Sequence, residues 1–419
     1  MHVSPPPSQA PVMRPADYYR LPWTLNDNVL SWLEPTKKCN LYCEGCYSTN
    51  EPHSHKSLAT VRQDLDVFVA HRRMDSVSIA GGDPLTHPEI VEIVRIVKED
   101  YGLKPVVNTN GLAMTPELLR QLKAAGLHGV TFHVDSSQAR PGWKGKDELE
   151  LCALRDEMAA MVAAEGGLSC AFNATVFRDT LHHVPALVRW AQRNIDRVQV
   201  MVFILFRTAR STEFEYLVNG RPVGLDRVTY RDQDKNPAPL TTQEVVQVIR
   251  RAEPAFDAAA YLGGTRDPES FKWTLFGRVG TPARIYGYVG PKFMETVQTA
   301  HHAVAGRYLA YADVRTNHMG RSLLAGFAAI DGGVRRAARA WLDDVARAPG
   351  TALRPLHFQS LAIIQPIDMT AAGEANMCDG CPDMTVHDGK LVWSCRLDEL
   401  RQYGAFFHCV PREAGGWRL

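Results

Sequence analysis

A regular alternation of strand-like and helix-like segments between residues 30 and 206 is the feature that most constrains how this 419-residue chain folds. Six runs of apolar and β-branched residues, from "VLSWLE" to "RVQVMVFILF", alternate with five segments of helical periodicity. Neighbouring parallel strands require such crossovers, because the end of one strand and the start of the next lie at opposite edges of the sheet. The pattern therefore predicts an α/β fold with a parallel sheet, either open or closed into a barrel.

Polar and glycine-rich residues stand where the predicted strands end. These stretches read "CNLYCEGC", "GGDP", "NTNG", "DSS" and "NAT" in chain order. The carboxyl ends of parallel strands meet at one edge of the sheet, and α/β folds place their ligand sites there. We therefore expect the chemistry of the chain at this edge.

The first of these stretches contains three cysteines, Cys39, Cys43 and Cys46, with the spacing C-x₃-C-x₂-C. No fourth cysteine follows within the next hundred residues, whereas closed zinc and iron–sulfur sites normally take four protein ligands. One interpretation is a [4Fe–4S] cluster with three thiolates and one iron open to a substrate or cofactor. The other is a zinc site completed by a histidine such as His53 or His55.

The cysteine spacing, its place after the first strand and the following β/α array resemble the radical S-adenosylmethionine (SAM) superfamily over residues 30–206, about half of the chain. The resemblance implies a partial (β/α)6 TIM-like barrel in which Cys39, Cys43 and Cys46 hold a [4Fe–4S] cluster. It also implies that S-adenosyl-L-methionine supplies the missing ligand through its amino and carboxylate groups. One electron then cleaves the sulfonium, and a 5′-deoxyadenosyl radical abstracts hydrogen from an unactivated carbon.

Further motifs match the family in the expected order. "GGDP" resembles the G-G-E-P motif that contacts the methionyl amino group, and "NTNG" stands where the family often carries T-N-G. Polar residues at the end of the fourth strand stand where family members contact the ribose and carboxylate. The residues that the resemblance assigns to cofactor binding are Gly81, Gly82, Asp83, Asn110, Asp135 and Ser136. His133, Asn173 and Thr175, at the ends of the fourth and fifth strands, are further candidates.

The sequence also departs from the family pattern. The residue before the third cysteine is usually an aromatic that helps to seat the adenine, but here it is Gly45. Either Tyr47, one place after Cys46, compensates as a cofactor contact, or the adenine is held in another way. Asp83 is shorter than the usual glutamate, and "QVMVFILF" carries no clear counterpart of the sixth-strand adenine motif.

A second group of cysteines lies near the C-terminus with the spacing C-x₂-C-x₁₃-C-x₁₃-C: Cys378, Cys381, Cys395 and Cys409. Four thiolates suit a second, auxiliary iron–sulfur cluster or a mononuclear zinc or iron site. The spacing loosely resembles the SPASM and twitch extensions of the radical SAM superfamily, which favours the cluster. Unligated thiols, and a three-cysteine site without Cys409, remain as alternatives.

The chain divides into four predicted regions. These are a disordered Pro-rich arm (1–28), the partial barrel (29–210), an α+β extension facing the substrate (211–370) and a C-terminal metal-binding segment (371–419). Within the extension, residues 241–256 and 332–348 read as helices, and residues 267–290 read as irregular with short strands. "HDGK" predicts a hairpin turn between the two halves of the C-terminal cysteine group.

Composition excludes several partner classes. The formal net charge is +1 and charged residues make up 22% of the chain, which gives no basis for binding nucleic acid or an anionic membrane. No run of eighteen apolar residues predicts a transmembrane helix, and the N-terminus lacks the apolar core of a signal peptide. We therefore expect a cytoplasmic protein, in which the nine cysteines are thiols or metal ligands.

The resemblance implies a radical SAM enzyme served by a flavodoxin- or ferredoxin-type electron donor. We expect C–H functionalisation of a small-molecule or lipid substrate in a biosynthetic pathway. The alternative is maturation of a ribosomal peptide; such enzymes often carry a leader-recognition domain before the barrel, and only about thirty residues precede it here. A second alternative is a non-catalytic iron–sulfur or zinc module that senses redox state.

Overall fold

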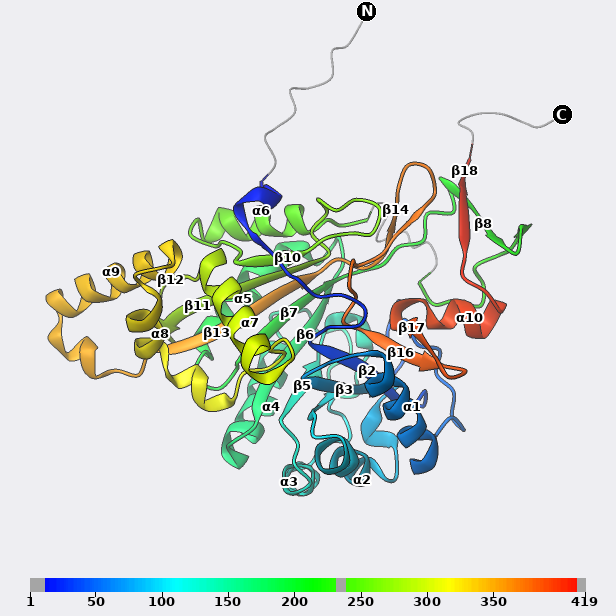
Figure 1. Cartoon of the computed structure of the whole chain (residues 1–419), viewed down its shortest axis with the longest axis horizontal. Helices are drawn as coiled ribbons and strands as arrows, with labels where there is room; N and C mark the ends of the chain where they lie inside the picture. The colour runs from blue at the N-terminus through cyan, green and yellow to red at the C-terminus, as the bar shows by residue number, and fades with distance from the viewer. Residues whose placement is uncertain (1–11, 231–238, 413–419) are drawn as a thin grey trace, which may run out of the picture.

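Six parallel strands, hydrogen-bonded in chain order, form the centre of the computed structural model, which describes residues 12–230 and 239–412 (Figure 1). These strands are β2 (Leu30–Thr36), β3 (Ser76–Gly81), β4 (Lys104–Thr109), β5 (Gly129–His133), β6 (Ser169–Val176) and β7 (Val200–Leu205). Each pairs in parallel with the next. The parallel sheet expected from the β/α alternation is confirmed.

Five crossover helices connect these strands. They are α1 (Leu58–His71), α2 (Ile90–Arg95, continued by wider π turns over Ile96–Asp100), α3 (Pro116–Ala124), α4 (Cys152–Glu165) and α5 (Val184–Arg193). Local chemistry explains where they begin: the Ser57 hydroxyl accepts from Thr60 N–H, and the Thr115 hydroxyl accepts from Leu118 N–H ahead of Pro116. The helices bury their apolar faces against the sheet, as in the contact between Phe172 and Trp190, whose ring centroids lie 5.2 Å apart.

Beyond β7 the sheet continues with strands from distant parts of the chain instead of closing on β2. They follow in the order β13 (His357–Ile364), β11 (Trp273–Thr281), β10 (Ala260–Leu262) and β1 (Tyr19–Arg20), with β12 (Arg284–Tyr288) beside β11. Strand β13 runs parallel to β7, and β11 runs antiparallel to β13. Residues 211–370 therefore widen the barrel sheet itself.

The expectation of irregular structure with short strands over residues 267–290 is met only in part. Strand β12 is short, but β11 spans nine residues, and those from Trp273 to Gly280 pair with β13. The register between β11 and β12 shifts between Val279 and Gly280, at the end of β11 from which the chain turns into β12.

The expected disordered arm over residues 1–28 differs from the structure in its second part. Residues 1–11 lie outside the described residues, but β1 pairs with β10, and Met13, Leu21 and Trp23 are buried. Their apolar surface is removed from water by packing against the sheet, which fixes this segment. The N-terminal segment therefore belongs to the fold from residue 12 onward.

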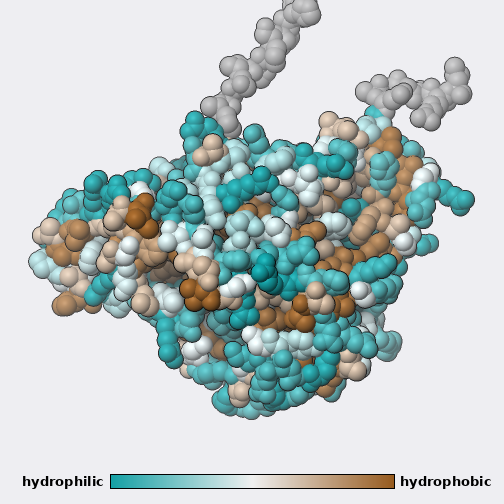
Figure 2. All heavy atoms as spheres, in the orientation of Figure 1, coloured by the Kyte–Doolittle hydropathy of each residue, from teal (hydrophilic) through white to brown (hydrophobic). Residues whose placement is uncertain are grey.

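A second group of helices covers the added strands. These are α6 (Thr242–Ala252), α7 (Pro291–Ala305), α8 (Gly320–Phe327) and α9 (Gly332–Arg347), the last two forming one end of the molecule (Figure 1). Figure 2 shows hydrophilic residues interspersed with apolar ones on the drawn face, including at this end. In this part of the chain Ile330 and Leu342 are exposed. Within the described part of the chain, no helix has the length and apolar character needed to cross a membrane.

The C-terminal residues pack across the expected domain boundaries. Strand β18 (His408–Pro411) pairs with β8 (Phe214–Val218), which also pairs with β9 (Arg221–Pro222), and β14 (Asp368–Met369) pairs with β15 (Ala375–Asn376). The hairpin of β16 (Met384–His387) and β17 (Lys390–Trp393) turns at Asp388 and Gly389, both at positive φ, which confirms the turn predicted at "HDGK". Helix α10 (Leu397–Tyr403) then lies beside the carboxyl edge of the barrel sheet (Figure 1).

Candidate active site

A cavity of about 190 Å³ opens at the carboxyl edge of the parallel strands. Every strand of the partial barrel contributes to its wall: Glu34 from β2, Gly81 from β3, Asn108 from β4, His133 from β5, Thr175 from β6 and Ile204 from β7. The position agrees with the edge at which the sequence placed the chemistry.

The three clustered cysteines all line this cavity. Cys39, Cys43 and Cys46 lie on the loop after β2, where Asn50 accepts from the Cys39 N–H at 3.0 Å and donates to the Cys39 carbonyl at 2.9 Å. Backbone N–H groups point at the sulfurs, from Leu41 to Cys39 Sγ and from Ser48 to Cys46 Sγ, each at 3.5 Å. Burial raises the pKa of the Cys46 thiol to about 11, so in the absence of a bound metal these thiols keep their protons.

The donor set fits an iron–sulfur cluster. Three thiols on one wall, with N–H groups directed at sulfur, suit a group that takes thiolate ligands and accepts hydrogen bonds. No three histidine, cysteine or acidic side chains among residues 12–230 and 239–412 are grouped to hold a single metal ion. The zinc alternative gains no histidine, because His53 and His55 lie outside the cavity wall, and His55 packs edge-on against His87.

Gly81 and Gly82 line the cavity, and they also let β3 approach the start of the cysteine loop. A Cβ at Gly82 would overlap the Lys38 carbonyl and lie 2.5 Å from the Lys37 carbonyl. The freed space brings the Gly82 N–H to the Thr36 carbonyl at 2.8 Å. The two glycines therefore hold the cysteine loop against β3, in addition to their expected place beside the cofactor.

Asp83 lies behind the cavity wall instead of facing it. Its carboxylate is fully buried and accepts from the Thr109 hydroxyl at 2.8 Å and from the Asn110 N–H at 2.8 Å. Burial raises the pKa of Asp83, although these hydrogen bonds act in the opposite direction. The shorter carboxylate thus ties the end of β3 to the end of β4, and it is connected to the cavity wall through Thr109 and Asn110.

Asn110 does line the cavity, as the sequence predicted. Its side-chain amide donates to Asn40 Oδ1 at 2.7 Å and points at Cys39 Sγ at 3.7 Å. One residue therefore connects the end of β4 with the cysteine loop, and its orientation is set from behind by Asp83.

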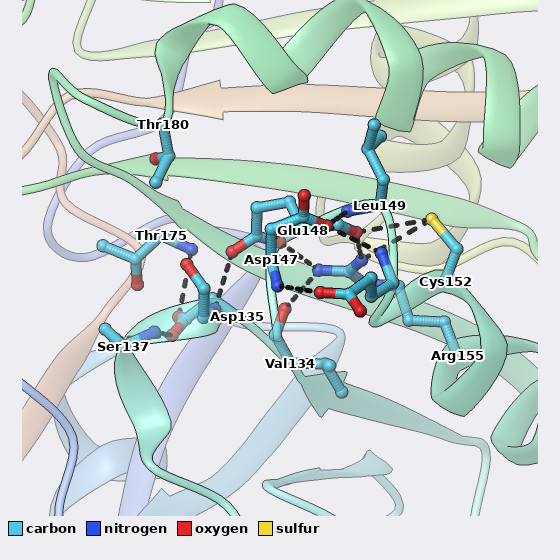
Figure 3. Close-up of polar contacts among 12 residues, drawn as sticks. Val134, Asp135, Ser137, Asp147, Glu148, Leu149, Cys152, Arg155, Thr175 and Thr180 are labelled. Carbon is cyan, nitrogen blue, oxygen red and sulfur yellow. Dashed lines mark hydrogen bonds and ion pairs between the residues drawn. The ribbon is translucent and has the colours of Figure 1, made fainter. Parts of the chain in front are cut away.

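Asp135 is buried behind His133, which lines the cavity and brings Nε2 to 2.8 Å from Asp135 Oδ2. Figure 3 shows the Asp135 carboxylate held between Ser137 and Thr175. Burial raises the pKa of Asp135, but the hydrogen bonds and charge of His133, with Ser137 and Thr175, outweigh burial and hold it well below its usual range. Asp135 is therefore an ionised partner that orients the imidazole.

Ser136 is not part of the cavity wall either. Its N–H donates to Glu148 Oε1 at 2.7 Å, and Glu148 forms a buried ion pair with Arg155 (Figure 3). Arg155 also donates to the Val134 carbonyl at 2.8 Å, so the pair supports the end of β5. Neither Ser136 nor Asp135 contributes to the wall; the reason is that the chain turns into a short 3₁₀ helix immediately after β5.

Two aromatic residues, Tyr47 and Phe206, lie near Gly45, where the family usually has an aromatic residue. Tyr47 reaches the edge of the cavity, but its ring packs against Tyr230 with centroids 6.2 Å apart in a separate buried cluster. The side chain that covers Gly45 is Phe206, directly after β7.

Phe206, Trp32 and Glu34 also line the cavity, although no sequence motif pointed to them. Trp32 and Glu34 are two residues apart on β2, and Ile204 and Phe206 are two apart on the segment of β7, which is the strand spacing that returns side chains to one face. This spacing of two residues was the feature of the sequence that could have identified them as cavity residues.

Residues 33–191 match the family model of the radical SAM superfamily. This part of the chain is a radical SAM domain. Among curated relatives, AdoMet-dependent heme synthase of Methanosarcina barkeri is 28% identical over 193 residues, 44% of this chain and 52% of that protein. GTP 3′,8-cyclase of Chlorobaculum tepidum is 27% identical over 211 residues, 48% of this chain and 60% of that protein. The chain thus spans about half the length of the curated relatives that it matches.

Solved structures of similar fold cover comparable shares. Streptococcus suis SuiB is 16% identical and covers 55% of this chain and 47% of its own, with a TM-score of 0.39. Methylornithine synthase (PylB) is 15% identical and covers 55% of this chain and 63% of its own, with a TM-score of 0.36.

The C-terminal segment is hydrogen-bonded to the cysteine loop. Asp398 of α10 accepts from Thr49 at both N–H (2.6 Å) and hydroxyl (2.7 Å). The buried Arg207, just after β7, pairs with Glu399 at 2.7 Å, and Ser394 reaches the cavity wall. Residues nearly 350 positions after the cysteine loop therefore help to fix it.

The structure places two of the four C-terminal cysteines together. Cys378 and Cys381 are buried in one apolar cluster, where the hydrogen bond between the two side chains and burial raise the pKa of Cys381, and the charge of Cys395 acts in the same direction on Cys381. Cys409 lies on β18 in a different cluster, against Phe214 and other residues of β8. Cys409 therefore packs apart from Cys378 and Cys381, because β18 pairs with β8 and not with the hairpin.

Buried hydrogen-bond donors without partners lie in the same region as Cys378 and Cys381. Arg72 donates to the Cys381 carbonyl at 3.0 Å, yet its Nε and Nη1 are buried without partners, as are the indole N–H groups of Trp23 and Trp393 in the same region. Burial lowers the pKa of Arg72 to about 10. A buried donor without a partner is costly, so this region fits a bound group that accepts hydrogen bonds, as the sulfides of an iron–sulfur cluster do.

Proposed function

We propose that this chain is a radical SAM enzyme that binds a [4Fe–4S] cluster through Cys39, Cys43 and Cys46 and cleaves S-adenosyl-L-methionine reductively. The supporting observation is that all three thiols face one cavity at the carboxyl edge of the parallel strands, together with Gly81 and Asn110. When bound, the cluster supplies the electron that releases methionine and a 5′-deoxyadenosyl radical, which takes a hydrogen atom from a substrate C–H group.

The protein contributes position and exclusion of water. Asn110 turns its amide toward Cys39, and the glycines of β3 keep the cysteine loop at a fixed depth. His133 presents an imidazole to the cavity, oriented by the ionised Asp135. Walls from six strands and from Ser394 enclose the reacting groups, which protects a radical from solvent.

The substrate that we propose is a small molecule with hydrogen-bonding groups. A row of polar side chains crosses the strands beneath the cysteines: the Asn173 amide donates to Asn108 Oδ1 at 3.3 Å, and the Asn108 amide donates to Ser78 at 3.2 Å. Asn108 and Asn173 both line the cavity. Each side-chain amide has two N–H donors and an oxygen with two lone pairs, so these bonds leave donor and acceptor capacity for a polar ligand, which favours such a molecule over a lipid.

A second iron–sulfur cluster at Cys378, Cys381 and Cys395 is also part of the proposal, supported by the unpartnered donors of Arg72 and the two indoles. We place the enzyme in the cytoplasm, where thiolate ligands stay reduced and a flavodoxin- or ferredoxin-type protein can supply the electron.

The proposal is tested by anaerobic reconstitution with iron and sulfide, followed by dithionite and S-adenosyl-L-methionine. We expect 5′-deoxyadenosine and methionine in equal amounts, measured by liquid chromatography. The control is a triple variant, Cys39→Ala, Cys43→Ala and Cys46→Ala, which should form neither product. A wild-type protein with a full cluster and no 5′-deoxyadenosine would contradict the proposal.

A further inference from the structure

Gly45 and Phe206 occupy one another's space. A Cβ at Gly45 would overlap the Phe206 ring, 2.7 Å from Cζ, 2.9 Å from Cδ2 and closer still to Cε2. Gly45 also has φ of +69°, a conformation that side-chain-bearing residues rarely adopt. No residue with a side chain fits at position 45 while the phenylalanine ring stays where it is.

The Phe206 ring is fixed from behind. Its N–H donates to the Val176 carbonyl at 3.0 Å, and its ring stacks on Phe177 with centroids 4.7 Å apart and planes 26° apart. Both phenylalanines are almost fully buried, at 4% and 3% exposure, while Phe206 lines the cavity beside the cysteine loop. A stacked pair held in this way presents a rigid aromatic surface to the cavity.

Tyr47 cannot supply that surface. Its ring lies against Tyr230, and its phenol oxygen accepts a hydrogen bond from the backbone N–H of Arg207. Burial raises the pKa of Tyr47, in keeping with a phenol enclosed by protein.

We propose that Phe206 is the residue against which the adenine of S-adenosyl-L-methionine packs, and that Gly45 is required because the aromatic side chain comes from the end of β7 instead of the cysteine loop. The inference rests on the proposed function. An adenine has a flat π face, and stacking of a nucleobase on an aromatic side chain typically changes affinity by about tenfold or more when the aromatic is removed. The contact fixes the nucleoside end of the cofactor and leaves the methionyl end to the residues near Cys39.

The test measures binding by equilibrium dialysis on anaerobically reconstituted protein, with three probes: S-adenosyl-L-methionine, 5′-deoxyadenosine and L-methionine. Phe206→Leu should weaken binding of the first two by about tenfold and leave L-methionine within about twofold. The matched control is Phe276→Leu, which opens another buried stacked pair, Phe256 and Phe276 at 4.4 Å, away from the cavity. That control should bind all three probes as the wild type does.

A second variant keeps the test independent of the folding of Phe206→Leu. Gly45→Ala displaces the ring without changing it, so it should lose affinity for 5′-deoxyadenosine but not for L-methionine. Because both changes act on one contact, Phe206→Leu combined with Gly45→Ala should bind 5′-deoxyadenosine no worse than Phe206→Leu alone. Iron content is measured in each sample to normalise for loaded protein.

The outcomes separate this inference from the proposed function. If the loaded wild type does not bind S-adenosyl-L-methionine, the proposed function fails. If the wild type binds it and Phe206→Leu binds 5′-deoxyadenosine equally well, only the inference fails. A loss of adenosine affinity in Tyr47→Leu that is absent from Phe206→Leu would overturn it in favour of Tyr47.

Discussion

Three glycines around the cysteine loop act through the side chains that they lack. Gly45 leaves room for the Phe206 ring, and Gly81 and Gly82 let the end of β3 touch the backbone of residues 34–38. A residue that reads in the sequence as a turn or as bare backbone is therefore a packing requirement in three dimensions. The cysteine loop is positioned by what surrounds it as much as by its own sequence.

Gly82→Ala should lower the amount of cluster that the protein holds. A methyl group at this position meets the Lys37 carbonyl at 2.5 Å and overlaps that of Lys38, so the loop must shift by enough to cost about 2 kcal/mol. The measurement is iron per chain after reconstitution, with thermal unfolding recorded in parallel. The control is Gly326→Ala in α8, where nothing lies within 4 Å of the new methyl group and no loss is expected. Equal iron content in both variants would refute the packing argument.

At the scale of elements, periodicity predicted the partial barrel because each of its strands and helices is defined by residues close in sequence. The same reasoning could not predict that β13 would pair with β7, or that β11 would extend the sheet, since such pairings depend on distant side chains. The site follows this division. The cysteines, Gly81, Gly82 and Asn110 lie in local motifs, whereas Phe206 enters the cavity through a contact between chain segments far apart in sequence.

Helix α10 should slow the loss of the cluster by holding the cysteine loop. Asp398 accepts two hydrogen bonds from Thr49. A hydrogen bond to a charged group typically contributes about 2 kcal/mol to stability. Asp398→Ala should therefore speed the release of iron to a chelator by about tenfold, followed as absorbance of the iron–chelator complex.

The matched control for this prediction is Arg401→Ala on the same helix. Arg401 pairs with Glu51 of the same loop, but both side chains are about one-third exposed, and such surface pairs contribute little. Its iron should leave at nearly the wild-type rate. If Asp398→Ala behaves like Arg401→Ala, the hydrogen bonds from Thr49 do not hold the loop.

At the scale of the whole molecule, the extension and the C-terminal segment are not separate bodies attached to a barrel. Strands from residues 260–364 continue the barrel sheet, α10 lies beside its carboxyl edge, and the hairpin of β16 and β17 packs against β2 and α1 (Figure 1). Arg207 illustrates the coupling: it leaves β7, donates to the Cys395 carbonyl at 2.6 Å and pairs with Glu399. The end of β7 and the C-terminal segment are therefore linked through one buried arginine.

This arrangement predicts two separable pools of iron. The variant with Cys39, Cys43 and Cys46 all changed to alanine should keep about four irons per chain, because the second group has its own thiolates and its own donors from Arg72. Adding Cys395→Ala to that variant should remove most of this iron, whereas adding Cys409→Ala should leave it, since Cys409 packs in another cluster. Iron and acid-labile sulfide are counted in each protein. Near-zero iron in the triple variant would rule out the second cluster, and an equal loss with Cys409→Ala would show that β18 moves to supply a fourth ligand.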